Sequence, residues 1–93
     1  MNRKAKGTRN ERRSRLLLEA DGYAVTRADG SLGTFDLIGI GPSDIVLCQV
    51  KTRDWPGTTE IATIRAFRTP RNARKVLHRW RDGASAPDVR VVK

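Results

Sequence analysis

The hydrophobic pattern is clearest near the middle of the chain, where two short apolar runs, residues 36–40 and 45–51, flank a Gly-Pro-Ser-Asp turn. Such runs on either side of a turn predict a β-hairpin. Pairing across the turn places Asp36 opposite Gln49, and Lys51 follows two residues later on the same side of the sheet. The predicted hairpin therefore gathers a carboxylate, an amide and an amine at one end, which indicates a functional site.

The rest of the chain shows the patterns of further regular elements: helices over residues 11–20 and 60–67, and strands over residues 23–27, 74–81 and 89–92. The helix caps are expected at Thr8 or Asn10 and at Thr58 or Thr59. Three consecutive leucines, Leu16–Leu18, are expected to supply the buried side of the first helix. Residues 74–81 also fit helical spacing, but the turn-rich segment that follows them favours a hairpin of two strands.

Glu11 is the one acidic residue in the basic N-terminal part of the chain. It lies seven residues before Leu18, so both side chains fall on nearly the same helical face and Glu11 has a route toward the sheet. The alternative is a first-turn glutamate that is stabilised by the helix dipole and paired with Arg15. Glu11 is therefore a candidate for the site only in combination with the hairpin.

Length and cysteine content restrict the class of protein. A chain of 93 residues predicts a single domain over residues 1–93, with residues 1–7 as a flexible basic arm. Cys48, the only cysteine, is expected to be buried, and it excludes an intrachain disulfide and a thiolate zinc cluster. His78, the only histidine, is expected at the surface or on a phosphate. No signal peptide or membrane span is apparent, which predicts a cytoplasmic protein.

Charge points to nucleic acid as the partner. The chain has 19 Lys and Arg against 10 Asp and Glu, a net charge of +9, and the basic residues are concentrated in residues 1–15 and 65–81. Two basic blocks with Arg in excess over Lys are typical of a surface that binds phosphates, and they lack the large aromatic face of a membrane-binding helix. The candidate nucleic-acid contacts are Arg3, Lys4, Lys6, Arg9, Arg12, Arg13, Arg53, Arg71, Arg74 and Lys75.

An acid on a helix, an acid at the start of a strand and a polar-x-Lys pair on the next strand resemble the signature of the PD-(D/E)xK nuclease superfamily. Within it the chain is most similar to the small Holliday-junction resolvases of archaea and phages. The similarity is carried by Lys6-Gly-Thr-Arg-Asn-Glu11, residues 22–27, Gly30-Ser31, Asp36-Leu-Ile and Gln49-Val-Lys51. It implies an α/β fold with a restriction-endonuclease-like core, a mixed β-sheet flanked by helices in the order αβββαββ, and a homodimer.

The resemblance also implies roles for the candidate residues. Asp36, Glu11 and Gln49 would lie at a bound Mg²⁺ or Mn²⁺, Lys51 would assist the attacking water, and Ser31 matches a loop serine that assists cleavage in some resolvases. Two positions depart from the signature: Phe35 stands where the family has Pro, and Gln49 stands where it has an acid. An amide oxygen still binds a hard cation, but it brings no negative charge.

Three functions follow from these observations. The first is a metal-dependent endodeoxyribonuclease that hydrolyses phosphodiester bonds in branched DNA, as a Holliday-junction resolvase does. The second is a related phage or bacterial repair or restriction-like nuclease that acts on flaps, single strands or duplex. The third is a catalytically degenerate basic module that binds nucleic acid without cleaving it.

Overall fold

The computed structural model describes residues 3–28 and 32–93, with side chains from Ala5 onward. Its elements, in chain order, are α1 (Arg3–Ala20), β1 (Ala24–Arg27), β2 (Leu37–Ile40), β3 (Ile45–Thr52), α2 (Thr58–Ala66), β4 (Ala73–Trp80) and β5 (Asp88–Val92). This order confirms the predicted αβββαββ arrangement, including the choice of strand rather than helix for residues 74–81. No helix in the described part of the chain is long and apolar enough to cross a membrane.

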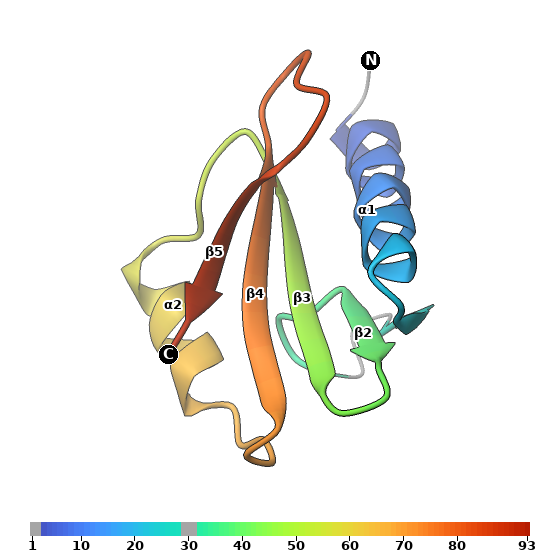
Figure 1. The fold of residues 1–93 in the computed structure, drawn as a ribbon. Coiled ribbons are helices and arrows are strands. Elements are labelled where there is room, and N and C mark those ends of the chain that lie inside the picture. The colour runs from blue at the N-terminus through green and yellow to red at the C-terminus, as the bar shows by residue number, and fades with distance from the viewer. Residues whose placement is uncertain (1–2, 29–31) are drawn as a thin grey trace.

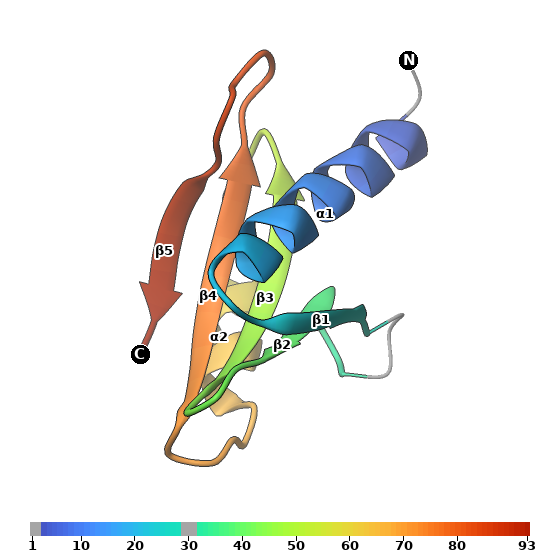
Figure 2. The ribbon, with the colours of Figure 1, turned by 45° about the vertical axis from the view of Figure 1, so that its right-hand side comes forward.

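The five strands form one mixed sheet in the order β1-β2-β3-β4-β5. Only β3 and β4 run parallel, and the other neighbouring pairs are antiparallel. A parallel pair requires a crossover between its strands, and α2 provides it. Figures 1 and 2 show the two helices on opposite faces of the sheet, with α1 in front of the strands and α2 behind them in Figure 2.

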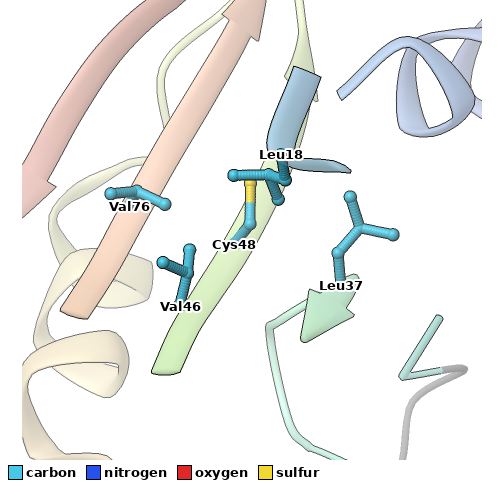
Figure 3. Close-up of a cluster of buried hydrophobic side chains, with 5 residues drawn as sticks. All are labelled: Leu18, Leu37, Val46, Cys48 and Val76. Atoms are coloured by element: carbon cyan, nitrogen blue, oxygen red, sulfur yellow. The ribbon is translucent and has the colours of Figure 1, made fainter. Parts of the chain in front are cut away.

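Each helix covers its own hydrophobic cluster. On the α1 face, Leu18 packs against Leu37, Val46, Cys48 and Val76, as Figure 3 shows. The cluster on the α2 face consists of Phe35, Leu47, Ile64, Leu77 and Val92. Because successive residues of a strand point to opposite faces, β3 contributes its even positions to the first cluster and its odd positions to the second. The burial of Cys48 was predicted, and burial raises the pKa of its thiol.

The first helix differs from the prediction in length and in its buried face. It begins at Arg3, so residues 3–7 belong to the helix rather than to an arm before it, and Thr8 and Asn10 are not its caps. Of the three consecutive leucines only Leu18 is buried, whereas Leu16 and Leu17 are 57% and 41% exposed. The C-terminal end follows the prediction, since Gly22 adopts a φ of 98° directly after the last turn.

Polar side chains fill the remaining contact between α1 and the sheet. Ser14 is fully buried and its Oγ lies 2.8 Å from both Nδ1 of His78 and Nε1 of Trp80. The indole N–H is a donor only, so Oγ of Ser14 accepts it, and the same hydroxyl also hydrogen-bonds Nδ1 of His78. The prediction of a surface or phosphate-contacting His78 is therefore wrong, and burial lowers the pKa of its imidazole.

The second helix begins at Thr58, with Gly57 as its N-cap residue and no side-chain cap hydrogen bond. The predicted caps Thr58 and Thr59 are thus part of the helix. Ile64 is fully buried on its sheet-facing side, and Ile61 and Phe67 pack partly buried around it, as the spacing predicted. This packing fixes the first turn of α2, which carries Glu60, beside β3.

Candidate active site

The hairpin of β2 and β3 has the predicted register, with Ile40 opposite Ile45 and Ile38 opposite Leu47. Asp36 directly precedes the paired residues of β2. Its backbone N–H donates to the carbonyl oxygen of Cys48 (2.9 Å), and its carbonyl oxygen accepts the N–H of Ala28 (2.9 Å). These bonds hold Asp36 between the chain leaving β1 and strand β3, at the end of the hairpin that lies away from its turn.

The carboxylate of Asp36 is held from the backbone of β3. Its Oδ2 accepts the N–H of Val50 at 2.7 Å. Burial raises the pKa of Asp36, and this effect outweighs the opposing influence of the Val50 N–H and of the Lys51 charge. The Glu60 charge raises the pKa further, and the Arg27 charge lowers it. Asp36 is thus a partly desolvated carboxylate within electrostatic reach of both a cation and a second acid.

Gln49 and Lys51 meet on one residue that the sequence did not single out, Glu60. The Nε2 of Gln49 donates to Oε2 of Glu60 at 2.7 Å and to the carbonyl oxygen of Thr34 at 3.1 Å. The Nζ of Lys51 lies 3.0 Å from the other carboxylate oxygen of Glu60. One carboxylate from α2 therefore bridges the two polar side chains that the hairpin presents.

The amide of Gln49 is nearly closed off from solvent. The residue is only 4% exposed, and its Oε1 is buried without a hydrogen-bond partner in the part of the chain that the structure describes. Because both contacts of Nε2 are acceptors, the orientation of the amide follows from the hydrogen-bond network. A buried oxygen without a donor is unfavourable by about 1–3 kcal/mol, so a donor or a cation at this atom would be stabilising.

Glu11 occupies a separate pocket between α1 and the hairpin. Its carboxylate lies 3.6 Å from Nε of Arg27. The pocket has a volume of about 230 Å³ and is lined by Thr8, Glu11, Arg12, Arg15, Arg27 and Leu37. Since the Arg27 charge also acts on Asp36, this residue links the pocket electrostatically to the hairpin end. The predicted role of Glu11 at a metal is not tested by this placement and stays a prediction.

Several of the predicted nucleic-acid contacts are engaged within the protein. Lys6 and Arg53 both pair with Asp82, at 2.9 and 3.2 Å, beside the β4–β5 turn. Arg74 pairs with Asp44 at 3.0 Å and also donates to the hydroxyl of Tyr23. These pairs are exposed or half-exposed, and exposed ion pairs are weak, at about 0–1 kcal/mol. A phosphate can therefore compete for these cations.

Two other predicted nucleic-acid contacts, Arg13 and Lys75, are held more firmly by interactions within the protein. Arg13 lies over the ring of Trp80, 3.8 Å from its centroid, and donates to the carbonyl oxygen of Ala84. Lys75 donates to three carbonyl oxygens at the end of α2. The remaining candidates with described side chains are exposed, namely Arg9, Arg12 and Arg71. Ser31 and the side chains of Arg3 and Lys4 lie outside the described residues.

The donor set at the hairpin end fits a hard divalent cation. Asp36 and Glu60 offer carboxylate oxygens and Gln49 offers a buried amide oxygen, which are the ligand types that Mg²⁺ and Mn²⁺ prefer. Within residues 3–28 and 32–93, no group of three or more His, Cys, Asp or Glu is placed to hold a metal.

Glu60 was missed because its sequence position has an ordinary explanation. It stands in the first turn of α2, where an acid is favoured by the helix dipole whatever its surroundings. The one available signal was the crossover: a helix that connects parallel strands packs on the sheet beside them. That rule brings the start of α2 near the odd positions of β3, but it does not select Glu60.

The whole fold is similar to that of Hjc, a Holliday junction resolvase from the archaeal hyperthermophile Archaeoglobus fulgidus. The match has a TM-score of 0.74 and a sequence identity of 23%, and it covers 94% of this chain and 73% of that one. No family model and no curated protein sequence matches the chain. The similarity establishes the fold, and it confirms the predicted restriction-endonuclease-like mixed sheet flanked by helices.

Proposed function

We propose that the protein is a metal-dependent endonuclease that hydrolyses phosphodiester bonds in branched DNA, in the manner of a Holliday-junction resolvase. The observation that carries the proposal is the grouping of Asp36, Gln49, Lys51 and Glu60 at one end of the β2–β3 hairpin. The fold shared with a resolvase and the net charge of +9 support the same function.

Each residue has a definite task in this proposal. Asp36, oriented by the Val50 N–H, is the central ligand for Mg²⁺ or Mn²⁺, with Gln49 beside it and with Glu11 as the ligand contributed by α1. When bound, the metal stabilises negative charge on the phosphate and lowers the pKa of the attacking water. Lys51, two residues after Gln49 on β3, orients that water and stabilises the charge that develops on the phosphate oxygens.

The pocket on α1 gives the substrate backbone a place beside these residues. Arg12, Arg15 and Arg27 line it together with Thr8, Leu37 and the proposed metal ligand Glu11. Three guanidinium groups around one pocket suit a phosphate, because arginine binds phosphate oxygens with two parallel N–H bonds. Together with the exposed Arg9 and Arg71 and the weakly paired Lys6, Arg53 and Arg74, they form the proposed DNA contacts.

Cleavage of a branched substrate tests the proposal. The full chain is incubated with a synthetic four-way junction, a flap, a single strand and a linear duplex, in Mg²⁺, Mn²⁺ or EDTA. We expect metal-dependent cleavage of the junction that is faster than that of the other substrates. D36N and K51A should each cut at least about 100-fold more slowly. The exposed residues Glu19 and Lys93 provide matched controls, E19Q and K93A.

The other outcomes select among the alternatives. Equal rates for D36N and wild type would rule out the assigned site. Preferential cutting of flaps, single strands or duplex would favour the related nuclease. Tight, salt-sensitive binding without cleavage in any divalent metal would favour the degenerate binding module. Symmetric cutting of a junction requires two sites, so we also propose a homodimer, to be measured by sedimentation equilibrium.

A further inference from the structure

We infer that Glu60 supplies the second carboxylate of the metal site, in place of the acid that β3 lacks at position 49. The inference rests on the proposed function and names a ligand for it. In the family signature this negative charge is on the strand, whereas here it is on the adjoining helix α2. Gln49 is then a neutral hydrogen-bond partner of the Glu60 carboxylate.

Geometry is the first argument. Glutamine and glutamate have the same shape, so a glutamate at position 49 would place an oxygen where Nε2 of Gln49 stands. That atom is 2.7 Å from Oε2 of Glu60. The carboxylate of Glu60 therefore stands one hydrogen bond away from the place that a strand acid would occupy. Two ionised carboxylates at that distance repel each other strongly, so an acid on α2 favours a neutral residue at position 49.

The unsatisfied oxygen of Gln49 is the second and independent argument. Oε1 is buried and has no hydrogen-bond partner among the described residues, while Nε2 of the same amide donates to Glu60 and to the carbonyl oxygen of Thr34. The amide thus presents its donor side to the carboxylate, and its acceptor side is not satisfied by any described residue. A hard cation bound by Asp36 and Glu60 would satisfy this oxygen as a neutral third ligand.

The surrounding charges agree with this arrangement. The Glu60 charge is among those that raise the pKa of Asp36, which places the two carboxylates within electrostatic reach of each other. Lys51 is the cation that contacts Glu60 in this structure, at 3.0 Å, and both side chains are about one-third exposed. A partly exposed pair of this kind is still screened by solvent, so a divalent cation can displace the ammonium and leave Lys51 to face the substrate.

Binding of Mn²⁺ to the full chain without DNA tests the inference independently of cleavage. Calorimetric titration is carried out on wild type, D36N, E60Q, E19Q and the exchange variant Q49E/E60Q. We expect E60Q and D36N to lose roughly tenfold or more in Mn²⁺ affinity and E19Q to bind as wild type does. The exchange variant keeps the hydrogen bond and the net charge, and it should regain most of the affinity lost in E60Q.

Failure of the inference can be told apart from failure of the proposed function. If D36N loses Mn²⁺ affinity but E60Q binds like E19Q, Glu60 only neutralises Lys51 and the inference is wrong. If neither D36N nor E60Q loses affinity, the metal site itself is misplaced and the proposed function loses its basis. Should E60Q fail to fold, the exchange variant decides alone, because weak Mn²⁺ binding in a folded Q49E/E60Q would also overturn the inference.

Discussion

Lys75 is the residue for which the structure most changes the expected effect of a mutation. It lies on β4, in one of the basic blocks, and was predicted to contact DNA. Its Nζ instead donates to the carbonyl oxygens of Ile64 (2.7 Å), Arg65 (3.0 Å) and Phe67 (2.6 Å) at the end of α2. We therefore predict that K75M, which keeps the aliphatic stem and removes the ammonium, destabilises the fold.

The magnitude follows from the hydrogen bonds that the substitution removes. A hydrogen bond from a charged group contributes about 1.5–3 kcal/mol, and a cation at a helix C-terminus adds about 0.3–1 kcal/mol. Water can replace the exposed bond to Arg65, and the bonds to Ile64 and Phe67 are only partly buried. A loss of about 2–3 kcal/mol is the result, against a total stability of roughly 5–14 kcal/mol for a chain of this length.

Urea denaturation measures this loss. With an m-value of about 1 kcal/mol/M, the midpoint should fall by roughly 2–3 M, and the thermal midpoint by roughly 10–15 °C. R71M is the matched control, because Arg71 is an exposed cation just before β4 with no contact that the structure describes. Equal midpoints for K75M and R71M would refute the reasoning, and Lys75 would then be free to act as a DNA contact.

Two further predictions concern pH and charge. Burial raises the pKa of Asp36, so the folded state binds its proton more tightly than the unfolded state does, and stability declines as pH rises from about 4 through the raised pKa. In EDTA at pH 7, D36N should therefore melt at a higher temperature than wild type, and a lower melting temperature in calorimetry would contradict this. Burial lowers the pKa of His78, so stability should decline as pH falls below about 6.5. H78Q should flatten the change in melting temperature between pH 7 and pH 5, and a slope as steep as that of wild type would argue against a buried, neutral His78.

The hairpin could be predicted from sequence because its determinants are local. A four-residue turn fixes the register of the two strands that it joins, and a shift by one residue would turn the apolar side chains of both strands to the wrong face. The observed pairs of Ile40 with Ile45 and Ile38 with Leu47 are those that the turn requires. The same local information placed Asp36 directly before β2, where its carboxylate accepts the backbone N–H of Val50 on β3.

The buried face of α1 could be predicted only at Leu18, because the rest of that face is polar. Asn10 and Ser14 are buried, and their partners are Thr52 on β3 and His78 and Trp80 on β4. A polar residue is buried at little loss only when a partner meets it, and these partners are distant in sequence. Hydrophobicity alone therefore pointed to the three leucines, two of which are exposed.

The charges around position 49 offer a physical reason for the glutamine that stands there in place of the acid of the family signature. With Gln49 neutral, Asp36 and Glu60 against Lys51 leave a single net negative charge, which suits a divalent cation. A glutamate at position 49 would add a second charge in direct contact with Glu60, and such a pair does not stay fully ionised without a bound cation. The neutral strand residue and the acidic helix residue therefore form one unit: a change in either alone removes or doubles the charge at this point, and only their exchange preserves it.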